Sequence, residues 1–194
     1  MIPTPLPEAP ALEPSAKAPR IERSSFTERM LRLHLHALLD RRTREHGLWT
    51  CLDVGCGTGD LSVEIALRHR LDHVHGIDGR DMNGAPQRLD EAPPSEGPSV
   101  TFSREDLGGF LPLEDDSFDV ALAREVMERV EDRRCLVHEL CRVSRKLVIS
   151  EVHRRSRNEI ESLFDRAGYR LLEVRPVFFL KAISTDFLLV HAPR

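Results

Sequence analysis

The feature that most constrains the fold is a glycine-rich turn, Gly55-Cys56-Gly57-Thr58-Gly59, between two short patterned segments. Residues 49–54 have the length and apolar character of a buried strand, and residues 60–69 have the spacing of an amphipathic helix. Glycines at such a junction let the backbone turn sharply, and they let a ligand touch the main chain with no Cβ in the way. This strand–turn–helix unit predicts an α/β fold that binds a ligand where the strand ends.

Strand-like and helix-like segments alternate along most of the chain. This alternation predicts a mainly parallel sheet with helices on both faces, because each crossover between parallel strands packs a helix on the sheet. The last two β-rich segments have no helix between them, which predicts a C-terminal antiparallel hairpin. Glycines and prolines between residues 79 and 97 would leave only a short or distorted helix there. The expected helices are 26–44, 60–69, 125–143 and 156–167, and the expected strands are 49–54, 73–77, 100–103, 118–123, 146–151, 170–179 and 183–191.

Length and composition favour one folded domain. The chain has 194 residues, of which 40% are hydrophobic and 31% charged. Its first residues are rich in proline and alanine, so we expect a flexible tail over residues 1–20 and a folded domain over residues 21–194. That start has neither the basic end nor the apolar centre of a secretory signal.

Charge and cysteine content exclude several classes of protein. The formal net charge is −4, which argues against a polybasic nucleic-acid or membrane binder. No run reaches the roughly 18 apolar residues of a spanning helix, so no membrane partner is expected. The four cysteines form no C-x-x-C pair, and we interpret them as reduced thiols of a cytoplasmic protein with no metal site. The sequence carries no signal for an oligomeric state.

Acidic residues follow three successive predicted strands. Asp53 precedes the glycine turn, and its carboxylate suits a cation. The N-terminus of the helix beyond the turn suits an anion. Together these two features fit a zwitterion such as an amino acid. Asp78 lies at the spacing at which a carboxylate reaches a ribose. Asp106 can accept from an exocyclic amine, and the N–H of Leu107 can donate to a ring nitrogen. A dinucleotide fingerprint would have a third glycine where this chain has Asp60. The implied ligand combines an amino-acid head, a ribose and an adenine.

Together these motifs resemble the class I S-adenosylmethionine-dependent methyltransferases, of the small-molecule type. The resemblance implies a Rossmann-like, seven-stranded sheet with a reversed last strand, and S-adenosylmethionine as the cofactor across its first four strands. It also implies that Gly55 and Gly57 lie against the methionine moiety, Asp78 holds the ribose and Asp106 the adenine amine. The similar stretches are Asp53–Gly59, Gly76–Asp78, Asp106–Leu107, Asp116–Val120 and Arg124–Asp132. The cofactor-binding residues it implies are Asp53, Gly55, Cys56, Gly57, Asp60, Asp78, Gly79, Asp106, Leu107 and Arg124.

Candidate catalytic residues follow the fourth and fifth predicted strands. Methyl transfer from a sulfonium is an in-line displacement, and a general base is needed only when the acceptor arrives protonated. The candidates are Arg124, Glu125, Glu151 and His153. Histidine is the residue type whose unperturbed pKa suits a base near neutrality, which favours His153, but a surface histidine is the alternative. Glu125 could instead be a first-turn carboxylate of a helix that begins there.

The acceptor is expected to be a small molecule. After Ala123 the chain lacks the Asn/Asp-Pro-Pro-aromatic motif typical of relatives that methylate nucleobase or glutamine amines. A single tyrosine and a single tryptophan offer little base stacking, so a nucleic-acid partner is disfavoured. The helix at 26–44 is expected to cover the site, where its arginines either select an acidic acceptor or form a solvated face. The alternatives are a non-catalytic cofactor-binding module and an RNA or protein methyltransferase.

Overall fold

The structure is a computed structural model that describes residues 25–79, 97–177 and 186–194, with side chains described from Glu28 onward. The tail predicted over residues 1–20 lies outside these ranges, as does the short or distorted helix expected before residue 97. None of the helices within the described ranges is long and apolar enough to cross a membrane.

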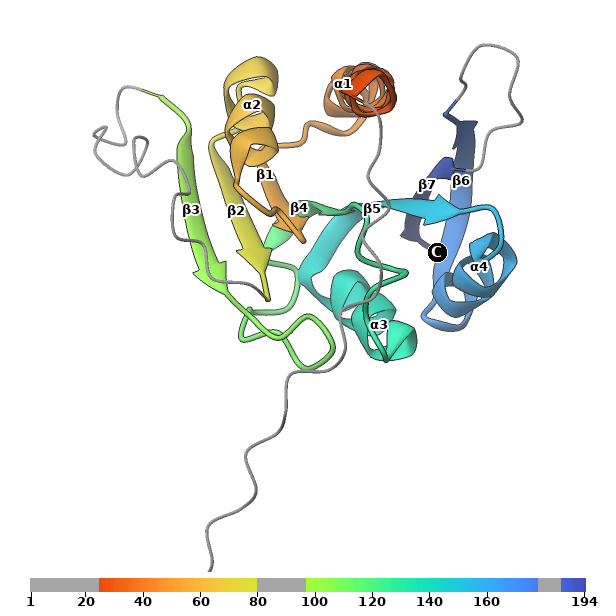
Figure 1. Ribbon diagram of the computed structural model, residues 1–194. Coiled ribbons are helices and arrows are strands. Elements are labelled where there is room, and N and C mark those ends of the chain that lie inside the picture. Colours follow the sequence, from red (N-terminus) through yellow and green to blue (C-terminus); the bar gives the residue numbers. More distant parts are fainter. Residues whose placement is uncertain (1–24, 80–96, 178–185) are drawn as a thin grey trace, which may run out of the picture.

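Seven strands form one sheet in the order β3-β2-β1-β4-β5-β7-β6 (Figure 1). Strands β3, β2, β1, β4 and β5 run parallel to one another, whereas β7 is antiparallel to both β5 and β6. The predicted α/β fold with a C-terminal antiparallel hairpin is therefore confirmed. The strands are β1 Thr50–Val54, β2 His73–Asp78, β3 Ser99–Arg104, β4 Phe118–Ala123, β5 Ser144–His153, β6 Tyr169–Pro176 and β7 Asp186–Pro193.

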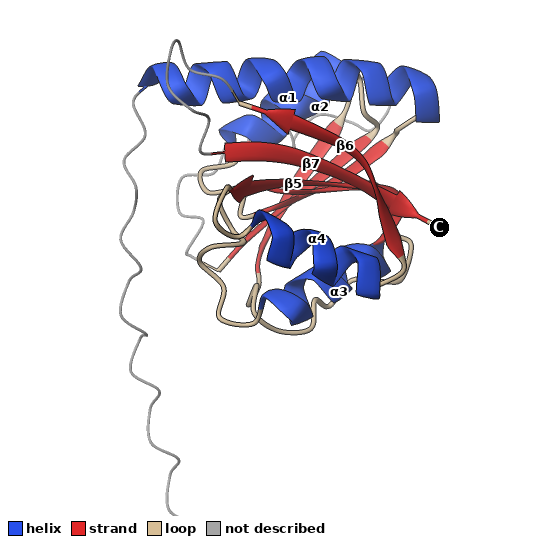
Figure 2. Ribbon diagram, turned by 90° about the vertical axis from the view of Figure 1, so that its right-hand side faces the viewer, coloured by secondary structure: helices blue, strands red, loops and turns tan. Residues whose placement is uncertain are grey.

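Helices cover both faces of the sheet, as predicted. Helices α1 and α2 lie on one face, and α3 and α4 lie on the other (Figures 1 and 2). Each pair closes its own hydrophobic core against the sheet, and the central strand β4 is buried along its whole length because it faces both cores. The helices are α1 Ser25–His46, α2 Asp60–His69, α3 Arg133–Val143 and α4 Arg157–Arg166.

The helix expected over residues 125–143 begins eight positions later than predicted, at Arg133. The Asp132 side chain accepts a hydrogen bond from the backbone N–H of Cys135 at 2.9 Å, which caps the helix start there. Upstream, the carbonyl of Val126 accepts from the N–H of Arg129 at 2.9 Å, so the chain forms a tight turn. Apolar spacing in residues 125–132 thus reflects a turn packed on the core, and this part of the prediction was wrong.

Helix α1 packs on the sheet through a leucine face and is tied to its neighbours by ion pairs. Its buried leucines belong to the same core as α2 and β1. The side chain of Arg42 pairs with Glu173 of β6 at 2.8 Å, and Arg32 pairs with Glu64 of α2 at 3.0 Å. These arginines therefore do not form the purely solvated face that was one of the two interpretations. The buried leucines are Leu31, Leu35, Leu38 and Leu39.

Candidate active site

The glycine turn after β1 is held against the end of β2. The backbone N–H groups of Gly55 and Cys56 donate to the carbonyl of Ile77 at 2.8 and 3.1 Å. Gly55 has a φ of 80°, which L side chains rarely adopt, and a Cβ there would lie 3.4 Å from the carbonyl oxygen of Arg124. Glycine at this position therefore keeps the turn close to the segment that follows β4, and the two together form one side of a hollow.

Two predicted carboxylates stand beside this turn on adjacent strands. Asp53 is 1% exposed, and its Oδ2 accepts from the Ser62 hydroxyl at 2.6 Å. Burial raises the pKa of Asp53, and the nearby charge of Asp78 acts in the same direction. The Oδ2 of Asp78 accepts from the backbone N–H of Gly57 at 3.0 Å. Asp53 is thus a buried residue that lines the hollow, and Asp78 supports the turn.

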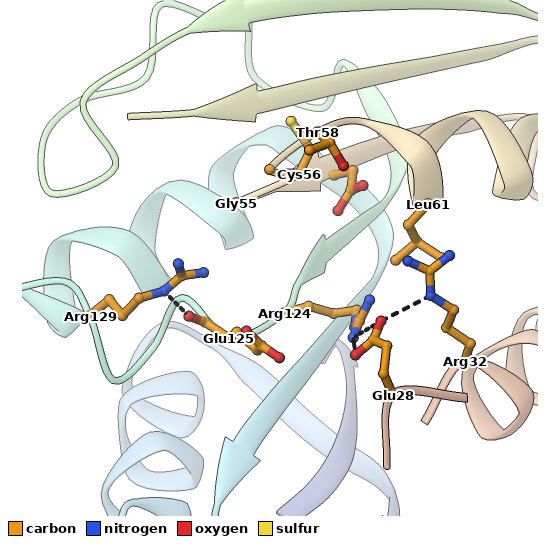
Figure 3. Close-up of a pocket in the computed structure, with 11 residues that line it drawn as sticks. Glu28, Arg32, Gly55, Cys56, Thr58, Leu61, Arg124, Glu125 and Arg129 are labelled. Atoms are coloured by element: carbon orange, nitrogen blue, oxygen red, sulfur yellow. Dashed lines mark hydrogen bonds and ion pairs between the residues drawn. The ribbon is translucent and has the colours of Figure 1, made fainter. Parts of the chain in front are cut away.

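A cavity of about 320 Å³ lies between the glycine turn, α1 and the segment after β4 (Figure 3). It brings together residues that are far apart in the sequence, including both Arg124 and Glu125 from the predicted set. Sequence reasoning missed Glu28, Arg32 and Arg129 as individual site residues, although it expected the helix at 26–44 to cover the site. The cavity is lined by Glu28, Arg32, Asp53, Gly55, Cys56, Gly57, Thr58, Leu61, Arg124, Glu125 and Arg129.

Some predicted cofactor-binding residues do not belong to this set of lining residues. Asp60 accepts from the Thr58 hydroxyl at 2.8 Å where α2 begins. Asp106 is exposed, and its Oδ1 accepts from the N–H of Gly108 at 3.0 Å, so the carboxylate folds onto its own loop. Leu107 is half-buried beside it, and Gly79 lies where β2 has ended. The ribose contact expected of Asp78 and the adenine contacts expected of Asp106 and Leu107 remain predictions.

Arg124 is the centre of an ion-pair chain across the cavity. Its Nε lies 3.3 Å from Glu151 of β5, and its Nη2 lies 3.0 Å from Glu28 of α1. Glu28 also pairs with Arg32 at 2.9 Å. Burial alone would raise the pKa of Glu28, but the guanidinium groups of Arg124 and Arg32 outweigh it and leave that pKa lowered. The chain links α1 to the sheet at the point where the cavity lies (Figure 3).

Glu125 and His153, two of the predicted candidates, lie in different surroundings. Glu125 lines the cavity and has a φ of 50°, an uncommon conformation for a residue other than glycine. It is not in the first turn of a helix, because α3 begins at Arg133, so that alternative is wrong. His153 is not one of the lining residues, and its Nδ1 accepts from the N–H of Arg155 at 3.2 Å. A role for His153 as a base stays a prediction.

The described parts of the chain contain no group of three histidine, cysteine or acidic side chains that could hold a metal ion. The polar groups of the cavity include carboxylates, guanidinium groups, the Thr58 side chain and the backbone of the glycine turn. This arrangement suits an organic ligand that carries both charges.

Comparison with known proteins identifies the family. A family profile described as a methyltransferase domain matches residues 52–148, from β1 to β5. The O-methyltransferase resE of Aspergillus sclerotiorum is 30% identical over 199 residues, which cover 82% of this chain and 71% of that protein. The chain belongs to the methyltransferase family. This methyltransferase is also 37% identical over 95 residues to the ubiquinone biosynthesis O-methyltransferase of Hahella chejuensis, although the match covers only 48% of this chain and 38% of that protein.

Solved structures show the same fold. The methyltransferase superposes on a magnesium protoporphyrin IX methyltransferase from Synechocystis with bound S-adenosylmethionine, at a TM-score of 0.64 and 18% identity. The match covers 89% of this chain and 86% of that one. This methyltransferase thus shares the fold of a protein that was solved with S-adenosylmethionine bound. Its glycine turn and the cavity beside it fit this cofactor, because they combine an open backbone, the buried carboxylate of Asp53 and the start of a helix.

Proposed function

We propose that this methyltransferase transfers a methyl group to a hydroxyl oxygen of a small organic acceptor. The observation that carries the proposal is the cavity of about 320 Å³, which joins the glycine turn to Arg124 and Glu125. That volume is at the lower end of the range for small-molecule sites, so it suits a compact acceptor next to the methionine moiety. The O-methyltransferase names of two similar proteins support oxygen as the acceptor atom.

In this proposal the glycine turn and its carboxylates hold the cofactor. The backbone at Gly55 and Gly57 lies against the methionine moiety, and the buried carboxylate of Asp53 attracts its ammonium group. Asp78 binds the ribose hydroxyls, and Asp106 binds the adenine amine after its side chain turns toward the ligand. S-adenosylmethionine supplies a methyl group that is already activated by the positive sulfur. The remaining task of the protein is to align the acceptor oxygen and exclude water.

The cover of the cavity and the candidate base also come from this chain. Helix α1 places Glu28 and Arg32 in the cavity wall, which supports a domain in which this helix closes the site. Glu125 is our preferred proton acceptor for the hydroxyl group, because it lines the cavity and His153 does not. We also propose a cytoplasmic location, supported by four free cysteines.

The test is methyl transfer from labelled S-adenosylmethionine to a panel of small phenols, hydroxy acids, thiols and amines. We expect labelled methyl ethers, and we expect Glu125→Gln to lower kcat by about 10²-fold or more at neutral pH. Glu114→Gln, an exposed carboxylate on a loop away from the cavity, is the matched control. Binding of the cofactor without transfer to any acceptor would favour the non-catalytic module. Salt-dependent transfer to RNA or protein alone would favour a macromolecular acceptor.

A further inference from the structure

Three arginines line the cavity within the described part of the chain, and they differ in how their charge is neutralised. Arg124 lies between two carboxylates, those of Glu28 and Glu151. Arg32 lies between Glu28 and Glu64, at 2.9 and 3.0 Å. Both guanidinium groups are therefore already engaged by protein carboxylates, and they have little capacity for an anionic ligand.

Arg129 is different, because no carboxylate of the described residues forms an ion pair with it. Its Nε donates to the backbone carbonyl of Glu125, and the two terminal nitrogens of the guanidinium point away from that carbonyl (Figure 3). A guanidinium fixed through Nε still offers a planar pair of donors to a ligand. Arg129 thus brings to the cavity wall a positive charge that no carboxylate of the described residues neutralises.

The backbone around Arg129 is shaped to hold this side chain at the cavity. Its N–H donates to the carbonyl of Val126 at 2.9 Å, which closes the turn after β4. Glu125, at the start of this turn, adopts a φ of 50°. Such a conformation costs of order 1 kcal/mol or more for a residue with a side chain, and it is retained most often where it positions functional groups. The turn directs the Glu125 carbonyl and the Arg129 side chain toward each other.

We propose that Arg129 binds a carboxylate of the methyl acceptor, so that the acceptor is a small hydroxy acid. The proposal rests on the proposed function, since it names the class of molecule that this function would methylate. A carboxylate accepts two parallel hydrogen bonds from a guanidinium, and this geometry orients the acceptor as well as binding it. The carboxylate of the cofactor has another anchor, because the glycine turn leads into the N-terminus of α2.

The first measurement compares ligands on the wild-type protein loaded with S-adenosylhomocysteine. Calorimetric titration with a panel of aromatic and aliphatic hydroxy acids is set against titration with the primary amides of the same acids. We expect the best acid to bind at least about tenfold more tightly than its amide. If no acid of the panel binds more tightly than its amide, the proposal is wrong, whatever methyl transfer is seen to neutral acceptors.

The second measurement uses Arg129→Gln, with Arg134→Gln on the exposed surface of α3 as the matched control. We expect Arg129→Gln to weaken binding of the acid, and to raise its KM, by about tenfold to a hundredfold while kcat and the Kd of S-adenosylhomocysteine change less than about threefold. Arg129→Lys should restore part of the loss. A large rise in the Kd of S-adenosylhomocysteine with unchanged binding of the acid would show that Arg129 holds the carboxylate of the cofactor, and would overturn the proposal. Failure of the proposed function itself would appear differently, as absence of methyl transfer to every small acceptor.

Discussion

His191 of β7 provides a sharp test of how burial controls the stability of this fold. Its side chain is 1% exposed, and its ring stacks on Phe164 of α4 with 3.9 Å between centroids and 15° between planes. Within the residues that the structure describes, neither ring nitrogen has a hydrogen-bond partner. Burial lowers the pKa of His191 from 6.5 to about 4, because the charged imidazolium would lose its hydration without gaining a partner.

The sign of the effect follows from proton binding in the two states. In the unfolded chain the imidazole binds a proton near pH 6.5, whereas in the folded protein it does so only near pH 4. Between these values the unfolded state holds the extra proton, so the free energy of unfolding decreases as the pH falls. Each unit by which the pH falls in this interval lowers the free energy of unfolding by about 1.4 kcal/mol, and the whole interval lowers it by about 3 kcal/mol. Above pH 6.5 and below about pH 4, His191 adds nothing to the pH dependence of the free energy of unfolding.

The assay is urea unfolding of the wild type and of His191→Phe at a series of pH values from 7.5 to about 4. The phenylalanine keeps a ring against Phe164 but cannot titrate. We expect the stability of the variant relative to the wild type to grow by about 3 kcal/mol as the pH falls through this range. His46→Gln, at the exposed end of α1, should give a curve parallel to the wild type. Parallel curves for His191→Phe and the wild type would refute the reasoning.

Two further substitutions test the glycine turn and a buried ion pair. Gly55→Ala places a side chain at a φ of 80° and 3.4 Å from a neighbouring carbonyl, so we expect the Kd of S-adenosylhomocysteine to rise at least about tenfold by calorimetry. Gly97→Ala, where an added Cβ meets no atom within 4 Å, should leave it unchanged. Arg142→Met leaves the buried carboxylate of Glu139 without the guanidinium that contacts it at 2.6 Å, and we expect the free energy of unfolding in urea to fall by about 3 kcal/mol. A fall of less than about 1 kcal/mol would contradict the importance of this pair.

The sheet could be predicted because its signals are local. Strand β4 is a short run of mostly apolar residues, and its predicted bounds agree with the structure. The helix predicted from Glu125 was wrong because apolar spacing cannot distinguish a tight turn packed on the core from the first turns of a helix. The start of α3 is instead set by Asp132, seven positions after Glu125, whose side chain caps the helix.

Part of the site could also be predicted, because some of its sequence signals are local. The glycine turn, Asp53 and Asp78 are fixed by strand ends and short spacings, so their neighbourhood could be foreseen. The contact of Glu28 with Arg124 joins residues 96 positions apart and arises only when α1 packs across the sheet. His153 also follows a strand that ends near the site, but which way its ring turns depends on the local hydrogen bond from Arg155. Side-chain direction of this kind is a tertiary property that one sequence does not encode in a short motif.

The most direct test of the whole account is the affinity of the protein for S-adenosylhomocysteine, measured by calorimetric titration of the wild type, Asp78→Asn and Asp72→Asn. Asp78 supports the glycine turn through Gly57, whereas Asp72 is exposed at the opposite end of β2. The account predicts a micromolar Kd for the wild type and for Asp72→Asn, and a loss of about a hundredfold for Asp78→Asn. Equal affinity of all three proteins, or no binding by the wild type, would contradict it.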